Sequence, residues 1–467
     1  MAPEIETLTT KSIAQKAKKS WKFWLIFWLV SAILLFAWYI FLQIRNRNIE
    51  NLKPFVKALP IGSERRNELE VMTDIYSKVG GFGGENTFLL LLQNDMELRP
   101  GGGFIGAFGI LKTKNGGVSD IQIHDTGNFD PRIPDTEQPP YPMGERLHIS
   151  SWKLRDSNWS PDFRVNAEKA EYFYKLGQGG ENFDGIIAVN TDILNSILKI
   201  TGPLKINDYP GEYSDENAIF QLEYQVEKGY AEQGIAKGDR KSVMKEMANV
   251  LAEKLHGLST AQQFELAKMI EGHLKQKDIQ LFFKNEGLQA EVEDMNWGGR
   301  VKDFGGNYLM LVDANLNSLK SDYCMRRKID YQVDLNSDQP TAAMNITYEH
   351  TCRTRDWMTT NYNDWARLYV PDGSWLSESS ISQPDMRFGK DFGKKVIEFP
   401  VYVPVGNTET VTLKYNLPAE IKSNLNSLLI QKQSGSGDLP VKVTVKKADG
   451  SVSEMSDILT EDKVFNF

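Results

Sequence analysis

One stretch constrains the fold more than any other: Asn86 to Lys112, which reads NTFLLLLQNDMELRPGGGFIGAFGILK. Its first apolar run, Leu89–Leu92, is short and bounded by polar residues, which predicts a strand buried on both faces. Phe104–Leu111 predicts the next strand, and the three glycines between them let a ligand or another backbone approach closely. Charge beside a glycine loop at a strand end favours a functional site. A glycine-rich hairpin with solvated charges is the alternative.

A second stretch, Trp21–Gln43, is almost wholly apolar. Such a helix would be about 30 Å long, enough to span a bilayer. Aromatic residues lie near both ends, and the lysines that precede it favour a cytoplasmic N-terminus. Ile44-Arg45-Asn46 lacks the small residues of a signal-peptide cleavage site. We therefore expect a cytoplasmic tail (residues 1–20), one transmembrane helix (21–43) and a chain that continues outside the cytoplasm; a buried soluble helix is the alternative.

Composition sets wider bounds. The 467 residues are enough for two or three domains with sizeable cores. The net charge of -8 argues against a general nucleic-acid binder, which would carry a basic face. Residues 44–84 begin irregularly and then show helical spacing, which predicts a stalk or leading helix.

The middle of the chain, residues 85–320, is predicted to be an α/β domain. Phe183–Val189 is typical of a buried strand, and Thr191 is a suitable N-cap for the helix that follows. Asp125–Met143 reads as a long irregular loop, of the kind that often has a function. A further helix is expected to begin near Asp239, with Asp239 as its N-cap. Basic residues in a first turn oppose the helix dipole, so Arg240 and Lys241 are explained either as anion ligands or as solvated charges.

Residues 321–467 change to period-two alternation with frequent turns, which predicts an antiparallel β-sandwich. Cys324 and Cys352 both lie in this region. An even number of cysteines outside the cytoplasm is compatible with a disulfide, and two unconnected buried thiols are the alternative.

Several charged residues lie at predicted element ends beside glycine or aromatic sequence. They are Asp95, Arg99, Arg155, Asp156, Asp239 and Arg240. Arginine suits bidentate phosphate recognition, and carboxylates could hold Mg²⁺ against a diphosphate. The chain contains no G-x-S-x-G elbow, Walker loop, G-x-G-x-x-G or metalloprotease helix.

Four segments carry a resemblance to an uncharacterised family of bacterial membrane-anchored proteins. They are LLLLQNDMELRPGGGFIGAFG, FDGIIAVNTDILNSILKITGP, VDANLNSLKSDYCMRRKIDY and LLIQKQSG. The family is catalogued as a domain of unknown function, so it implies an architecture and no activity.

The chain also resembles, more distantly, the LytR-CpsA-Psr phosphotransferases, which move glycopolymers from polyprenyl-diphosphate carriers to the cell wall. Asp95 looks like the acid at the end of that family's first strand, with Arg99 after it. Arg155-Asp156 looks like its Arg-Asp pair, and Asp239-Arg240 like the start of its arginine helix. The resemblance implies a mixed sheet with flanking helices.

The chain departs from that pattern at two positions. The second acidic position falls in Gly101–Gly103, and the second helix arginine would fall near Val243. Losing one carboxylate and one arginine weakens charge neutralisation in phosphoryl-type transfer. The resemblance still assigns catalytic roles to Asp95, Arg99 and Arg240, with Asp95 as the Mg²⁺ ligand. It assigns ligand contacts to Arg155, Asp156, Gly102, Gly103 and Asp239.

These features together predict a single-pass cell-envelope protein. Its ectodomain would bind or transfer polyprenyl-diphosphate-linked glycopolymers, with the membrane and other envelope proteins as partners and without nucleic acid. The alternative is a non-catalytic envelope or surface protein, structural or adhesive, that acts through the β-sandwich.

Overall fold

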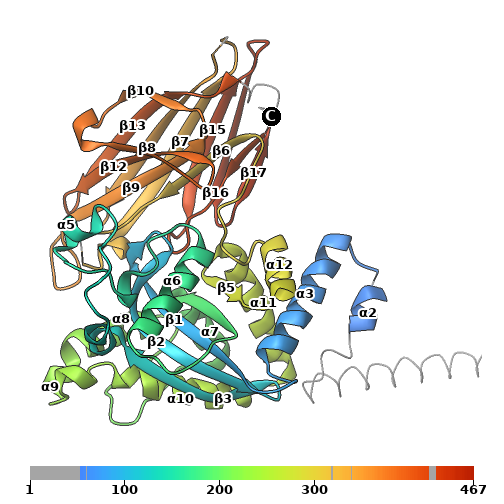
Figure 1. The fold of residues 1–467 in the computed structure, drawn as a ribbon, viewed down its shortest axis with the longest axis vertical. Coiled ribbons are helices and arrows are strands. Elements are labelled where there is room, and N and C mark those ends of the chain that lie inside the picture. The colour runs from blue at the N-terminus through green and yellow to red at the C-terminus, as the bar shows by residue number, and fades with distance from the viewer. Residues whose placement is uncertain (1–52, 59, 317–318, 338, 420–426) are drawn as a thin grey trace, which may run out of the picture.

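The computed structural model describes residues 53–58, 60–316, 319–337, 339–419 and 427–467. They form an α/β domain and, on top of it in Figure 1, a β-sandwich. Among these residues no helix is both long and apolar enough to cross a membrane. The predicted anchor, Trp21–Gln43, lies outside them, as do the predicted tail and the start of the stalk.

The α/β domain is built on a five-stranded sheet of order β3-β2-β1-β4-β5. Its strands are β1 (Asn86–Arg99), β2 (Gly102–Lys114), β3 (Gly117–Asp125), β4 (Gly185–Asn190) and β5 (Ile279–Phe283). β1 and β4 are parallel and the other pairs are antiparallel, so the sheet is mixed. The prediction of a mixed α/β sheet is confirmed.

Helices cover both faces of this sheet (Figure 1). The longer ones are α3 (Ser63–Val79), α6 (Phe163–Leu176), α7 (Asp192–Thr201), α10 (Ser242–His256), α11 (Thr260–Gln276) and α12 (Glu286–Asp294). The shorter ones are α2 (Lys53–Ala58), α4 (Thr126–Phe129), α5 (Met143–Leu147), α8 (Ala218–Tyr224) and α9 (Tyr230–Glu232), with 3-10 turns η2 (Asp130–Arg132), η3 (Leu154–Asp156) and η5 (Lys237–Asp239) and a π-helical turn η4 (Gln225–Gly229).

The two faces of β1 have different surroundings because successive strand residues point to opposite sides. Leu89 and Leu91 are fully buried in the core beneath α6. Leu90 and Leu92 point the other way, toward α7 and α10, and line a cavity there. The apolar run therefore packs on both faces of the sheet, against the α6 layer on one side and the α7 and α10 layer on the other, as its unbroken pattern predicts.

Several expected helix starts differ from the structure. Asp239 does not cap α10; it ends η5, and the N-cap position of α10 is Lys241. Thr191 precedes α7, yet its side chain makes no capping bond, because its hydroxyl donates to Asp95 instead. The predicted irregular loop after Asp125 contains α4 and η2, and Asp125 itself caps α4 by accepting from the Gly127 N–H.

The sandwich consists of two six-stranded sheets, β10-β13-β8-β7-β15-β16 and β11-β12-β9-β6-β14-β17. Its strands are β6 (Asn307–Val312), β7 (Met325–Asp334), β8 (Thr341–His350), β9 (Tyr362–Pro371), β10 (Trp375–Ser379), β11 (Arg387–Asp391), β12 (Lys394–Val403), β13 (Thr408–Asn416), β14 (Ser427–Ile430), β15 (Leu439–Lys446), β16 (Val452–Leu459) and β17 (Lys463–Asn466). Short 3-10 turns η6 (Ser321–Cys324) and η7 (Gln383–Asp385) join them.

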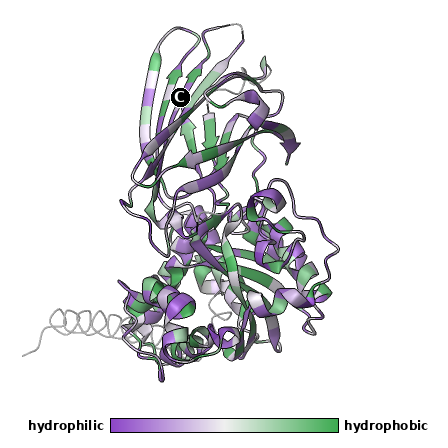
Figure 2. Cartoon of the chain, turned by 90° about the vertical axis from the view of Figure 1, so that its left-hand side faces the viewer, coloured by the Kyte–Doolittle hydropathy of each residue, from purple (hydrophilic) through white to green (hydrophobic). Residues whose placement is uncertain are grey.

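The sandwich differs from the prediction in two respects. Two strand pairs, β6 with β14 and β7 with β15, are parallel, so the sheets are mixed rather than antiparallel. β6 belongs to the second sheet, upstream of the expected boundary at residue 321. Hydrophobic and hydrophilic segments alternate along the strands (Figure 2), and the inward side chains form one continuous core between the sheets.

A disulfide joins Cys324, at the end of η6, to Cys352, just after β8. The two cysteines are 28 residues apart in sequence, so the bond closes a loop that contains β7 and β8. The bond therefore fixes the segment that leads from the domain junction into the sandwich.

Replacing both Cys324 and Cys352 with serine is expected to lower the free energy of unfolding by roughly 3 kcal/mol, because a loop of this length gains freedom in the unfolded chain. Urea denaturation of the oxidised wild type and the double variant measures the loss. Adding a reductant should lower the stability of the wild type to that of the variant and leave the variant unchanged. Equal stability of the oxidised wild type and the variant would contradict the prediction.

Candidate functional site

Two cavities lie near the carboxyl end of β1, and they differ in character. One is apolar, has a volume of about 440 Å³ and lies within the α/β domain. The other is polar, has a volume of about 530 Å³ and lies between the two domains. Both volumes are in the range typical of small-molecule sites.

The apolar cavity lies between the sheet and the helices α7, α8 and α10. Its apolar lining comprises Leu90, Leu92, Val118, Ile121, Ile123, Val189, Ile193, Leu194, Ile197, Leu222, Val226, Met244, Met247, Ala248, Leu251, Ala252 and Leu255. Leucine, isoleucine, valine and methionine dominate this lining, so the space suits a hydrocarbon chain.

A row of charged side chains borders the same cavity. Arg240 Nη1 donates to Glu227 at 3.1 Å, and Lys320 lies 3.6 Å from Glu227 and 3.4 Å from Glu223. Burial raises the pKa of Glu223, while Lys320 beside it acts to lower it. Bases and carboxylates therefore alternate along this edge of the cavity.

Lys241 extends this row toward β3. Its ammonium donates to Asp125 at 2.7 Å and to the carbonyl of Gly106. Burial lowers the pKa of Lys241, and the carboxylate of Asp125 partly opposes this effect. Asp125 also lies 3.7 Å from Arg240, so one carboxylate holds two bases at the cavity.

Two buried amides beside the cavity have unused hydrogen-bonding groups. Gln93 is 2% exposed, and within the described residues neither its amide nitrogen nor its oxygen has a partner. Asn190 donates to Ser434 at 3.2 Å, while its own oxygen accepts nothing from the described chain. A buried polar group without a partner costs free energy, so these amides favour a polar ligand group or water at this end.

Arg99, a predicted catalytic residue, is buried at the domain junction. It is 2% exposed and donates to Glu97 at 2.9 Å, to Asp156 at 3.4 Å and to the carbonyl of Asn315 at 2.6 Å. Burial would lower the pKa of Arg99, but the charges of Glu97 and Asp156 outweigh it and raise the pKa. Its hydrogen-bonding groups are thus directed at the protein itself.

Arg240 lines the apolar cavity, whereas Arg155 does not. Arg155 pairs with Asp130 at 2.5 Å, and its neighbour Leu154 packs in the core on the α6 side, with Leu89 and Leu91. Arg240 borders the cavity on the other side, with Leu90 and Leu92. The segment that carries Arg155 thus packs on the face of β1 opposite the cavity, while the partners of the two arginines, Asp130 and Asp125, lie at the two ends of the short helix α4.

Asp95, the predicted acid and metal ligand, lines the polar cavity rather than the apolar one. Its carboxylate accepts from the Thr191 hydroxyl. Burial, followed by the charge of Asp192, raises the pKa of Asp95 to about 8. Among the described residues no three His, Cys, Asp or Glu side chains are grouped to hold a metal ion. The residues around Asp95 do not form an all-protein Mg²⁺ site, and Mg²⁺ binding stays a prediction.

The predicted glycine loop is explained by packing. A Cβ on Gly102, whose φ is +132°, would collide with the Gln93 amide, and one on Gly103 would collide with the Asn94 backbone. The sandwich loop after β14 lies against this turn: a Cβ on Gly435 would be 3.2 Å from the Asp95 side chain. Gln433 in that loop donates to the carbonyls of Arg99 and Asp313, at 3.0 and 2.8 Å. The segments NDMELRPGGG and LLIQKQSG therefore meet at the domain junction.

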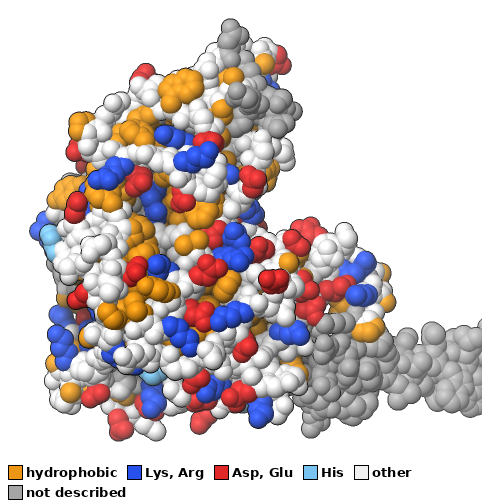
Figure 3. Space-filling view, in the orientation of Figure 1, with side chains coloured by type: hydrophobic (Ala, Val, Ile, Leu, Met, Phe, Trp, Pro, Cys, Tyr) orange, Lys and Arg blue, Asp and Glu red, His pale blue; other side chains and the backbone are white. Residues whose placement is uncertain are grey.

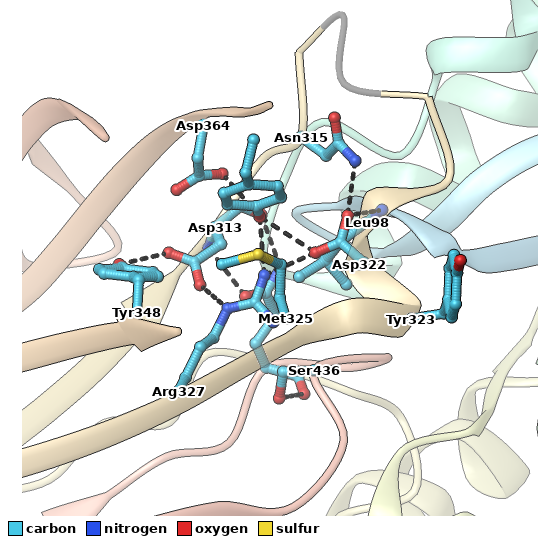
Figure 4. Close-up of polar contacts among 12 residues, drawn as sticks. Leu98, Asp313, Asn315, Asp322, Tyr323, Met325, Arg327, Tyr348, Asp364 and Ser436 are labelled. Atoms are coloured by element: carbon cyan, nitrogen blue, oxygen red, sulfur yellow. Dashed lines mark hydrogen bonds and ion pairs between the residues drawn. The ribbon is translucent and has the colours of Figure 1, made fainter. Parts of the chain in front are cut away.

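A buried polar network lies next to this junction (Figure 4). Arg327 donates to Asp313 and to Asp322, each at 2.6 Å. Asp322 also accepts from the backbone N–H of Leu98, at 3.0 Å, and from Asn315, at 2.6 Å. The network thus fastens the end of β1 to the first strands of the sandwich.

Sequence reasoning missed most of the residues at the apolar cavity. Arg240 and Lys241, both considered from the sequence as anion ligands, line it, whereas Lys320, Gln93 and Asn190 were not predicted. Lys320 belongs to the junction with the sandwich, so its position at the cavity could be known only from the tertiary fold. The position of Lys241 directly after Arg240, in a first turn that disfavours bases, was the one available signal.

Comparison with known families gives one match. Residues 83–226 match the family described as Protein of unknown function (DUF4012). The DUF4012 match runs from just before β1 to η4 and includes Asp95, Arg99 and Arg155, while Arg240 lies beyond it. It confirms the resemblance to a family of unknown function over these residues.

Comparison with curated proteins finds no match. Among solved structures, similarity is found to a candidate nutrient-binding protein of Legionella pneumophila (9% identity, TM-score 0.19; 30% of this chain and 54% of that chain). It is also found to an M1 zinc metallopeptidase mutant of Deinococcus radiodurans bound to a Tyr-Ser-Ala substrate (10%, 0.16; 31% and 40%). This chain thus spans about half or less of their lengths, and the TM-scores are too low to bear on fold or function.

Proposed function

We propose that the α/β domain binds a lipid whose hydrocarbon chain occupies the apolar cavity, within a single-pass cell-envelope protein. The observation that carries the proposal is the cavity itself, about 440 Å³ with an apolar lining and a charged edge. A preformed apolar space with a few polar groups is typical of sites for amphipathic ligands.

The lipid class we propose is a polyprenyl diphosphate linked to a glycopolymer. Arg240, Lys241 and Lys320 are the bases that a diphosphate would contact at the cavity edge. Glu223 and Glu227 hold two of these bases without a ligand. Because burial raises the pKa of Glu223, this carboxyl gives up its charge more readily than an exposed one, which would free Lys320 for a phosphate.

We propose binding rather than transfer. Transfer of the kind that the LytR-CpsA-Psr resemblance implies would need the acid, the metal and the arginines at one head group. Asp95 lines the other cavity, Arg99 is held by Glu97 and Asp156, and Arg155 is paired with Asp130 and does not line the apolar cavity. This separation supports a carrier or presentation role.

Filling the cavity is expected to abolish lipid binding. Ala248 lies on α10 and lines the cavity, so Ala248→Trp would place an indole in the space of the chain. We expect this variant of the full-length protein, in detergent, to bind geranylgeranyl diphosphate more weakly by about tenfold or more, measured by isothermal titration calorimetry. The matched control is Asn249→Trp, which adds an indole at the next, exposed position of the same helix.

The head group is tested separately. Arg240→Met should weaken binding of geranylgeranyl diphosphate and leave binding of geranylgeraniol unchanged, because the alcohol carries no anionic group. If Ala248→Trp and Asn249→Trp bind the diphosphate equally well, the lipid proposal fails. If the alcohol binds as tightly as the diphosphate, the cavity takes a lipid and the diphosphate assignment is wrong.

A further inference from the structure

The polar cavity between the two domains has no role in the lipid proposal. Its volume is about 530 Å³, and the α/β domain and the sandwich both line it. Asn94 and Thr191 line the apolar cavity, while the next residues in sequence, Asp95 and Asp192, line the polar one. The two cavities are therefore neighbours with separate linings.

The lining is rich in groups that accept or donate hydrogen bonds. Carboxylates come from Asp95, Asp192, Asp278, Asp322 and Asp438, amides from Asn195 and Gln276, and a hydroxyl from Ser436. The buried amide oxygen of Asn195 accepts no hydrogen bond from the described residues. The cavity can thus bind a ligand with many hydroxyl groups.

The charge of the lining restricts the class of ligand. Three bases, Arg326, Arg327 and Lys432, face the five aspartates. Arg327 is paired with Asp322, while Arg326 and Lys432 donate to backbone carbonyls. Because the pKa of Asp95 is raised to about 8, this carboxyl carries little charge at neutral pH, and Asp192, Asp278 and Asp438 remain opposite two bases. This excess of carboxyl groups over bases disfavours an acidic ligand.

Two aromatic side chains line this cavity, and a second aromatic pair lies one helical turn away. Phe220 and Tyr323 both line it, with ring centroids 5.6 Å apart, and Phe220 is 48% exposed. Tyr224, one helical turn after Phe220, is 40% exposed, and its ring centroid lies 6.1 Å from that of Trp357 in the sandwich. Exposed aromatic rings grouped at a cavity mark a binding surface, and their flat faces stack on the C–H faces of sugar rings.

We infer that the interdomain cavity binds a neutral or amino saccharide, with the exposed ring of Phe220 stacking on a sugar ring, Tyr323 packing edge-to-face against Phe220, and the aspartates accepting from the sugar hydroxyls. The site does not depend on lipid binding in the apolar cavity. Its ligand is either a free oligosaccharide or part of a longer glycan, because both present the same ring faces and hydroxyls.

Calorimetry on the full-length chain in detergent tests this site. The probes are maltotetraose, tetra-N-acetylchitotetraose and tetragalacturonate. At least one of the two uncharged probes should bind, and tetragalacturonate should bind about tenfold more weakly or not at all. Phe220→Ala should lower the affinity for the probe that binds by about tenfold, because the ring that stacks on the sugar is lost. Phe264→Ala removes another exposed phenylalanine, on α11 and outside the cavity lining, and should not change saccharide binding.

Three results would overturn the inference: neither uncharged probe binds, Phe220→Ala binds as well as Phe264→Ala, or tetragalacturonate binds as tightly as the uncharged probes. Ala248→Trp should leave saccharide binding intact, and Phe220→Ala should leave lipid binding intact, so failure at one site is distinguished from failure at the other. Repeating the titration with a longer chain of the same sugar shows whether the source is a glycan, since a glycan site binds the longer chain more tightly.

Discussion

Arg327→Met is expected to lower the free energy of unfolding by about 3–5 kcal/mol. Arg327 is 7% exposed and pairs with Asp313 and Asp322, and its guanidinium also donates to the Tyr362 hydroxyl at 2.7 Å. Methionine fills a similar volume but leaves two buried carboxylates without their cation. Removing one partner of a buried pair is costly because the remaining charge cannot be solvated.

The adjacent residue provides the control for this prediction. Arg326 has an exposed side chain that donates to the carbonyls of Tyr323 and Met325. Arg326→Met should therefore change stability by about 0.5 kcal/mol or less. Urea denaturation followed by tryptophan fluorescence measures both variants. A loss below about 1 kcal/mol for Arg327→Met would show that the network contributes little to stability.

Much of the α/β sheet could be predicted from the sequence because its strands are marked by local pattern. The unbroken run Leu89–Leu92 predicts a strand with two buried faces, and both faces are used. Helix starts were less accurate. Gly238 and Asp239 carry a helix-start signal but form a 3-10 turn, so α10 begins at Ser242.

The sandwich shows which properties local pattern does not determine. Alternation along β7 and β15 correctly indicates strands with one buried face. It does not indicate direction, and these two strands pair in parallel although they are far apart in sequence. Partner choice depends on the whole fold, so the antiparallel prediction was too simple.

The candidate site was the least predictable part, because charge beside glycine has two explanations. Arg99 is buried and connects the two domains, whereas Arg240 borders a cavity. Both residues nevertheless lie beside glycine-containing segments. The two roles can be distinguished only when the residues that contact each arginine are known. Asn315, a partner of Arg99, comes from the junction with the sandwich, while Asp125 and Glu227, the partners of Arg240, come from separate elements of the α/β domain.

The distribution of charge on one face of the molecule agrees with the composition. Acidic and basic side chains are interspersed on the face shown in Figure 3. A net charge of -8 without a basic field on that face is consistent with the expectation that nucleic acid is not a partner. That expectation stays a prediction.

Asp95→Asn is expected to stabilise the protein at alkaline pH. The pKa of Asp95 is raised from its ordinary value of 3.8 to about 8 by burial and then by the charge of Asp192, while the Thr191 hydroxyl acts to lower it. A carboxyl with a higher pKa when folded binds more protons when folded, so its contribution to stability falls as pH rises from about 4 to about 8. Asparagine carries no charge at any pH and keeps an oxygen that can accept from Thr191.

The free energy of unfolding, measured at pH 5, 7 and 9, should therefore show the variant gaining on the wild type as pH rises. A tenfold change in proton affinity corresponds to about 1.4 kcal/mol, so the gain by pH 9 is on the order of 2–5 kcal/mol. Asp120→Asn, at an exposed position in β3, should show no such trend. A constant difference between wild type and Asp95→Asn across this range would mean that Asp95 ionises as an ordinary carboxyl. The predicted trend would instead mean that Asp95 retains its proton at neutral pH, which suits a hydrogen-bonding group in the polar cavity better than an anionic metal ligand.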